Sequence, residues 1–131
     1  MSVVDDDLDK ILETVALYHD AHYYADVERL ERAFHQEAQI IGHYHGDSFV
    51  TKRDDYKAVI DADTSPASLG EPTDLRILAI DRTDTTAFVK IESLMRGDVF
   101  ISMLTLWKAS SGDWQIVSGV FHHQESKAQG C

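Results

Sequence analysis

The chain has 131 residues, 44% of them hydrophobic, and a formal net charge of −11. This length is typical of one domain, and the apolar fraction is large enough to bury a core. The acidity, with no Lys/Arg cluster, argues against nucleic acid and anionic membranes as partners, because both present phosphate groups. The sequence contains no run of 18 apolar residues, so no membrane span is predicted.

The ends of the chain bear on where the protein works. The N-terminal segment MSVVDDDLDK is acidic, whereas a secretory signal is first basic and then apolar. The only cysteine, Cys131, is the last residue and cannot close an internal disulfide. Both features predict a cytoplasmic protein. We expect residues 1–131 to form a single domain, with residues 1–4 and 125–131 as flexible tails.

Two helices are predicted near the start of the chain. Over residues 5–24, apolar residues recur at spacings of three and four, which predicts a buried stripe that includes Tyr18 and His22. Asp26 is placed to cap a second helix over residues 27–34. The two helices are nearly contiguous, so we expect them to form a bent pair.

The hydrophobic period changes after the second helix. EAQIIGHYHGDSFVT predicts two short strands around a turn at Gly46-Asp47. A third helix is predicted over residues 53–63, and a loop that holds both prolines follows over residues 64–73. The remaining segments predict four strands, over residues 74–84, 85–98, 99–113 and 114–124. Helices segregated from an antiparallel sheet make this an α+β domain, with a cavity where the layers diverge.

The two longest strands predict which faces are covered. In the strand at 85–98, the more continuous apolar face should meet the helices, and it contains Ala87, Val89, Ile91, Ser93 and Met95. The strand at 99–113 is apolar on both faces, with Val99, Ile101, Met103 and Trp107 on one and Phe100, Leu104 and Leu106 on the other. A second layer outside the sheet is therefore predicted, and in a chain this small we expect it to come from a homodimer.

One long segment carries a family resemblance. ALYHDAHYYADVERLERAFHQEAQIIGHYHGD resembles the opening of the nuclear transport factor 2-like superfamily, in its SnoaL-like or "putative lumazine-binding" branch. The shared features are an aromatic-rich first helix, an Ala-Asp break, a helix ending in Phe-His, and Ala-x-Ile/Leu-x-Gly. WQIV at residues 114–117 is similar to the last strand of that group. The resemblance implies a cone-shaped barrel, in which one curved, mainly antiparallel sheet wraps around three helices, and dimerisation through the sheet.

The superfamily contains isomerases, cyclases, dehydratases, transport factors and modules without a known reaction, so fold alone does not fix the chemistry. Its steroid isomerases use a carboxylate base and an oxyanion hole made of a tyrosine and a protonated acid. By resemblance, Tyr18 matches the tyrosine, the base falls at Gly42, and the acid falls near Met103. Only one of the three groups is present, which argues against that mechanism.

Tyr18 and several histidines are candidate site residues, and most of them have both a functional and a structural interpretation. His22, one helical turn after Tyr18, is either an acid–base group or a packed residue at the pocket rim, and Tyr18 is either a ligand donor or a buried core tyrosine. His19 is expected on the surface. His43 and His45 should share one polar strand face, a spacing compatible with metal ligands. Glu92 and Asp47 could supply oxygen ligands, but the spacing does not require it. We therefore predict no metal and no cofactor.

These observations favour a small-molecule-binding protein with a mainly apolar pocket, which takes an apolar or aromatic organic ligand. It could act by acid–base chemistry of the cyclase, isomerase or dehydratase kind. The candidate catalytic residues are Tyr18 as donor and His22 or His43 as the titrating group. The candidate ligand-binding wall consists of Trp107, Trp114, Met103 and Phe34. The alternative is a non-catalytic dimeric association or ligand-sequestering module, with its pocket filled by its own side chains.

Overall fold

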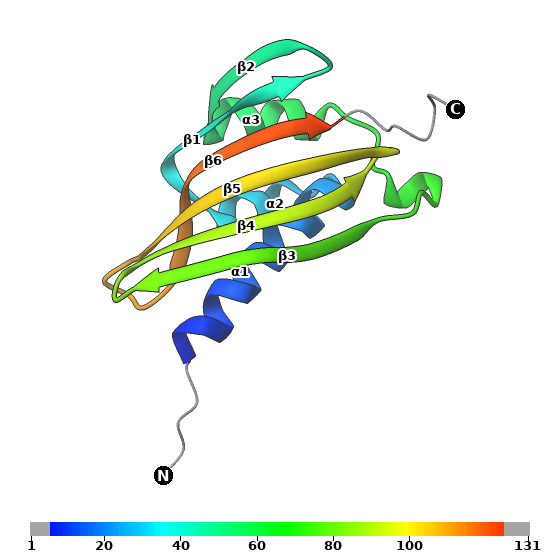
Figure 1. Cartoon of the computed structure of the whole chain (residues 1–131). Coiled ribbons are helices and arrows are strands. Elements are labelled where there is room, and N and C mark those ends of the chain that lie inside the picture. Colours follow the sequence, from blue (N-terminus) through cyan, green and yellow to red (C-terminus); the bar gives the residue numbers. More distant parts are fainter. Residues whose placement is uncertain (1–5, 125–131) are drawn as a thin grey trace.

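Three helices pack against one face of a curved sheet in the computed structural model, which describes residues 6–124 (Figure 1). The helices are α1 (Asp6–Tyr23), α2 (Val27–Ala33) and α3 (Arg53–Asp61). The strands are β1 (Phe34–Tyr44), β2 (Asp47–Lys52), β3 (Asp74–Thr83), β4 (Thr86–Met95), β5 (Asp98–Lys108) and β6 (Trp114–Gln124). The predicted α+β class is confirmed. The predicted tails, residues 1–4 and 125–131 with Cys131, lie outside the described residues.

The bent helix pair forms where the sequence predicts it. The Asp26 carboxylate accepts hydrogen bonds from the backbone N–H groups of Glu28 and Arg29, at 3.0 and 3.2 Å, so the predicted cap of α2 is confirmed. The helix ends one residue earlier than predicted, because Phe34 adopts extended backbone angles and begins β1. The chain therefore passes from helix to strand without a loop.

The sheet has the strand order β2-β1-β6-β5-β4-β3 and is open, with β2 and β3 at its edges. Neighbouring strands run antiparallel except β1 and β6, which are parallel. Because β6 is parallel to β1 and antiparallel to β5, the ends of β1 and β6 and the start of β5 meet at the same end of the sheet. The loop before β3 contains a short 3-10 helix, Ala67–Leu69.

The two faces of the sheet differ in their cover. The inner face meets the helices, and Ala87, Val89 and Ile91 of β4 are buried there, as predicted. On β5 the inner residues Leu104 and Leu106 are fully buried. The outer residues of β5 stay exposed, although several are large and apolar. Among residues 6–124, no helix combines the length and apolar character needed to cross a membrane.

The hairpin between β1 and β2 turns one residue earlier than predicted. Its two turn residues are His45 and Gly46, and both have positive φ, 51° and 86°. This pair of left-handed residues is typical of a type I′ hairpin turn. Histidine is one of the few non-glycine residues enriched in this conformation. The turn breaks the strand alternation, so His45 does not follow the face on which His43 lies.

Candidate functional site

A cavity of about 160 Å³ lies on the inner face of the sheet, near the end of α1. Its wall is aromatic for the most part, with Tyr18, Tyr44, Phe49, Tyr56, Phe100 and Phe121. The rings support one another edge to face. Phe49, for example, contacts both Tyr56 and Phe121 with ring centroids 5.8 and 5.9 Å apart. The cavity is therefore rigidly walled and mainly apolar.

Two hydroxyls face each other inside this wall. The Tyr18 hydroxyl, from the buried stripe of α1, lies 3.4 Å from Oγ of Ser102 on β5. That is long for a bond between two oxygens, which is usually about 2.7–2.8 Å. Ser102 is 1% exposed, and burial raises the pKa of the Tyr18 hydroxyl, with the contact to Ser102 acting against that rise. Both groups are therefore neutral donors whose hydrogen-bonding capacity is not fully used by each other.

The imidazole of His22 has a partner at each nitrogen. Nδ1 lies 2.7 Å from the backbone oxygen of Tyr18, and Nε2 lies 2.5 Å from the Tyr56 hydroxyl. A carbonyl oxygen only accepts, so Nδ1 carries the proton and donates it, while Nε2 accepts from the Tyr56 O–H. His22 is thus fixed as one neutral tautomer inside the cavity.

Burial controls the protonation of this group. Desolvation lowers the pKa of His22 from 6.5 to about 4, despite the opposing effect of the Tyr18 backbone oxygen. Desolvation also raises the pKa of Tyr56 well above its ordinary value. At neutral pH His22 and Tyr56 are therefore uncharged, which suits a ligand without a formal charge.

The charged residues of the cavity stand at its rim. Arg96 and Asp63 form an ion pair at 3.2 Å, with side chains 26% and 49% exposed. His19 was expected on the surface, and this prediction is wrong. His19 is buried, and its Nε2 lies 3.0 Å from the Thr73 hydroxyl. Burial lowers the pKa of His19 as well, so the cavity has two uncharged histidines at neutral pH.

Of the predicted site residues, some line the cavity and the others lie elsewhere. Tyr18 and His22 line the cavity together, and their rings contact each other with centroids 4.7 Å apart. Phe34 packs behind Tyr18 as a fully buried core residue. His43 is exposed on β1 and pairs with Ser48 and His122 on the neighbouring strands, away from the cavity.

The tryptophans and the methionine that were predicted to form the ligand-binding wall do not line the cavity. Met103 and Trp107 belong to the outer face of β5 and are 44% and 39% exposed, so they do not line the cavity. The cause is the strand alternation, which turns Ser102 and Leu104 inward and Met103 outward. Trp114 is buried beside the first turn of α1, away from the cavity, where its indole N–H donates to Asp7 at 3.0 Å.

The glycine where the isomerase base would stand is closed to any side chain. A Cβ added to Gly42 would lie 2.3 Å from the backbone oxygen of Phe121 and 2.6 Å from its ring. Gly42 therefore allows β1 and β6 to approach closely, and Phe121 fills the space. Ser102, rather than Met103, is the β5 residue beside Tyr18, and a serine cannot act as a protonated carboxylic acid. The expectation that the steroid-isomerase set is incomplete agrees with this geometry.

Two functional residues were missed by sequence reasoning. Ser102 was overlooked because the strand at 99–113 was considered for its apolar residues, yet alternation alone would have placed it on the face of Leu104. Tyr56 lies within the third helix predicted over residues 53–63 but was not named as a site residue. Nothing in its sequence context indicates His22 as its partner, since the two are 34 residues apart.

Comparisons with known proteins give the family and the fold. The sequence profile of the family described as "Putative lumazine-binding" matches residues 6–122. None of the curated proteins compared with the chain matches it. An NTF2-like protein of unknown function from Methylobacillus flagellatus is 26% identical, with a TM-score of 0.80 and coverage of 95% of this chain and 97% of that one.

Two further solved structures share the fold. An NTF2-like protein of unknown function from Shewanella baltica is 23% identical, with a TM-score of 0.81 and coverage of 96% of this chain and 100% of that one. A ketosteroid isomerase-like protein from Erwinia carotovora atroseptica is 14% identical, with a TM-score of 0.69, coverage of 94% of this chain and 100% of that one. The chain belongs to the "Putative lumazine-binding" family within the NTF2-like superfamily.

Proposed function

We propose that this protein binds a small, uncharged cyclic molecule with one oxygen acceptor, held in the cavity by Tyr18 and Ser102. The observation that carries the proposal is a pair of hydroxyls 3.4 Å apart inside an aromatic wall, with Ser102 buried and Tyr18 half-buried. A buried hydroxyl without a good partner costs roughly 1–3 kcal/mol, so a ligand oxygen that accepts from both recovers that cost. The membership of a family named for ligand binding supports the same reading.

The cavity limits the size of this ligand. Its volume is about 160 Å³, and an apolar cavity of about 150 Å³ is known to hold one benzene molecule. One ring with a short substituent therefore fits inside, and a larger molecule would have to extend past the rim at Asp63 and Arg96. We accordingly favour a monocyclic ketone, aldehyde or ether over a steroid-sized ligand.

Acid–base conversion of the ligand has less support than binding. Among the described residues that line the cavity, Asp63 is the only carboxylate, and it is paired with Arg96 at the rim. His22 is the interior group that could accept a proton, but its pKa of about 4 makes it a weak base at neutral pH. An open cavity also favours ligand binding over a module whose pocket is filled by its own side chains.

The test compares two ligands of equal shape. Acetophenone carries a carbonyl oxygen and ethylbenzene does not. We expect acetophenone to bind about fivefold more tightly by isothermal titration calorimetry, because one hydrogen bond contributes roughly 1 kcal/mol. Tyr18→Phe should weaken this preference, because Ser102 is then the one remaining donor of the pair, while leaving ethylbenzene binding unchanged.

Tyr23→Phe is the matched control. Tyr23 lies on the same helix, but its hydroxyl donates to the backbone oxygen of Glu71 at 2.7 Å and does not line the cavity. This variant should keep the preference for acetophenone. Equal binding of the two ligands to the unmodified protein, or no binding of either, would refute the proposal.

We also propose a homodimer formed through the outer face of the sheet. Large apolar side chains of this face remain exposed in the single chain: Met103 and Val120, which are cross-strand neighbours, are 44% and 46% exposed, and Trp107 is 39% exposed. Leaving such a patch in water is unfavourable by about 25 cal/mol for each Å². A second copy of the same face would cover it symmetrically.

Light scattering tests the dimer. The expected mass is twice the 14.8 kDa of one chain. Met103→Glu should yield the single-chain mass, because it places a charge in the proposed interface. Leu69→Glu, at a 62% exposed position of the 3-10 helix away from the sheet, should leave the dimer intact. A single-chain mass for the unmodified protein at micromolar concentration would refute this proposal.

A further inference from the structure

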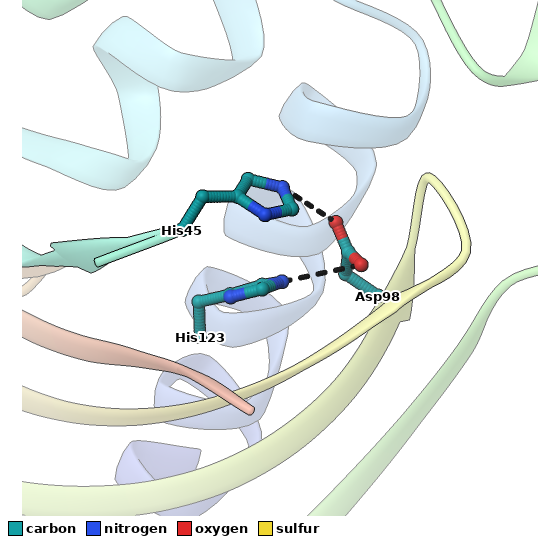
Figure 2. Close-up of side chains that lie close together, drawn as sticks. All are labelled: His45, Asp98 and His123. Atoms are coloured by element: carbon teal, nitrogen blue, oxygen red, sulfur yellow. Dashed lines mark ion pairs between the residues drawn. The ribbon is translucent and has the colours of Figure 1, made fainter. Parts of the chain in front are cut away.

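Three side chains of metal-ligating type meet at one end of the inner face, next to the cavity. Figure 2 shows the rings of His45 and His123 side by side with the carboxylate of Asp98 opposite both. One potential ligand atom from each residue lies within 4.8 Å of the other two. The three residues are far apart in sequence, so this grouping arises from the fold.

The topology explains why they meet. Asp98 is the first residue of β5, and His123 is the last but one of β6, beside Phe100 in the antiparallel ladder. The end of the parallel strand β1 lies at the same end of the sheet. His45 follows that strand, and its φ of 51° turns it toward His123, with ring centroids 4.1 Å apart. The sequence-based expectation that His43 and His45 share a face is therefore wrong.

Two of the separations are close to those of ligands around one ion. In a tetrahedral zinc site with bonds of 2.0–2.1 Å, two ligand atoms lie about 3.3 Å from each other. Nε2 of His45 lies 3.4 Å from one Asp98 oxygen, and Nε2 of His123 lies 3.2 Å from the other. Two imidazoles and one carboxylate are also a common ligand set for divalent first-row transition ions.

A second observation points to a ligand independently of these distances. The side chain of His123 is 3% exposed, and its Nε2 has no hydrogen-bond partner among the described residues, although Asp98 is 3.2 Å away. Proximity without alignment is not a hydrogen bond. A buried ring nitrogen normally finds a partner, because leaving it without one is costly. An ion between the three groups would supply that partner.

We propose that His45, Asp98 and His123 bind one Zn²⁺ per chain. Three protein ligands leave a fourth position for water or another molecule, as in zinc sites of the open type. The rings of Tyr44 and Phe100 pack against His123 with centroids 5.4 and 5.5 Å away, and both also line the cavity. The proposed ion is thus adjacent to the cavity, but its binding does not depend on the ligand proposed above.

The test is a calorimetric titration of the chain, free of any added histidine tag, with ZnCl₂. Cys131→Ser is present throughout, so that no thiolate contributes. We expect one Zn²⁺ per chain, with the affinity reduced about 100-fold or more in His45→Asn and in Asp98→Asn. Loss of even an outer-shell partner of a metal ligand typically costs about 10–100-fold, and these are direct ligands. Asparagine also tolerates the positive φ at position 45, so the turn is kept.

His43→Asn is the matched control. It lies two residues from His45 on the outer face, where it pairs with His122, and it should leave zinc affinity unchanged. Substituting Co²⁺ gives a second measure, because a tetrahedral site produces strong visible absorption, which His45→Asn should remove. The proposal is overturned if the chain binds no Zn²⁺, if His45→Asn binds as tightly as its parent, or if His43→Asn loses the ion instead. Circular dichroism of each variant confirms that a lost ion does not reflect a lost fold.

Discussion

The inner face of the sheet holds two histidine clusters that satisfy their hydrogen bonds differently. In the cavity, His22 donates through Nδ1 to a backbone oxygen and accepts through Nε2 from Tyr56. At the end of the sheet, His123 is more deeply buried, yet its Nε2 has no hydrogen-bond partner among the described residues. The first arrangement is complete without any other molecule. In the second arrangement, the proposed Zn²⁺ would supply the missing partner.

This difference separates the roles of the clusters. The imidazole of His22 is held between two groups of the cavity region, the backbone oxygen of Tyr18 and the hydroxyl of Tyr56. A histidine with a free nitrogen beside a carboxylate is a potential ligand. Phe121 and Phe100 connect the two regions, with ring centroids 6.2 Å apart. Substitutions in each cluster should therefore have distinct effects on stability, and changes to the packing between them should affect both.

The largest effect is expected at Gly42, which allows the backbone of β1 to pass Phe121 between the two regions. In Gly42→Ala, the new Cβ would meet the Phe121 backbone oxygen at 2.3 Å, so the strands must shift. We expect a loss of roughly 3 kcal/mol in the free energy of unfolding, at the upper end for overpacking, measured by urea denaturation.

Gly119→Ala is the control for this prediction. Its Cβ would meet a side-chain carbon of Leu104 at 3.4 Å, an ordinary contact, and the residue is on the same pair of strands. We expect a change of less than about 1 kcal/mol. If the two variants were equally stable, the close approach at Gly42 would not be a determinant of the fold.

The next effect is a pH dependence that arises from His22. Its pKa is 6.5 in the unfolded chain and about 4 in the folded one. As the pH falls from 6.5 to 4, the unfolded chain binds a proton that the folded chain does not, so stability decreases. The stabilisation is fully present above pH 6.5, and about 3 kcal/mol of it should be gone near pH 4.

The measurement is the difference in unfolding free energy between the parent and His22→Gln at several pH values. That difference should shrink as the pH falls through this window, because glutamine does not titrate. Groups that do not interact with His22 contribute equally to both proteins and cancel. A difference that stays constant from pH 7 to 4 would mean that His22 is not held neutral by burial.

The sequence predicted the parts of this molecule that depend on local pattern. The cap at Asp26 and the burial of Val89 and Leu104 follow from short-range chemistry and strand alternation, and all are confirmed. The clusters depend on long-range pairing that no local pattern encodes. Asp98 meets His123 only because β5 and β6 are neighbours, and His45 joins them through one positive φ. Met103 and Trp107 were expected at the cavity, although strand alternation places them on the outer face of β5.

A smaller effect is expected from Tyr56→Phe, which removes the partner of a satisfied imidazole. The buried Nε2 of His22 would lose its donor, so we expect a loss of about 1–3 kcal/mol in the free energy of unfolding by urea denaturation. Tyr23→Phe, which removes a hydroxyl bonded outside the cavity, is the control and should cost about 1 kcal/mol. If Tyr56→Phe did not change the free energy of unfolding, water would have replaced the hydroxyl. The hydrogen bonds of His22 would then not depend on the protein alone.

The smallest effect is expected from His45→Asn in metal-free protein. The His45 side chain is 54% exposed, and asparagine accepts the φ of 51° at this turn position. Without an ion the imidazole contributes little, so the free energy of unfolding should stay within about 0.5 kcal/mol of the parent. Adding Zn²⁺ should then raise the melting temperature of the parent but not that of the variant, because only the parent gains binding energy in the folded state. If His45→Asn were already strongly destabilising without metal, the end-of-sheet cluster would be complete in itself, and the contrast with His22 would fail.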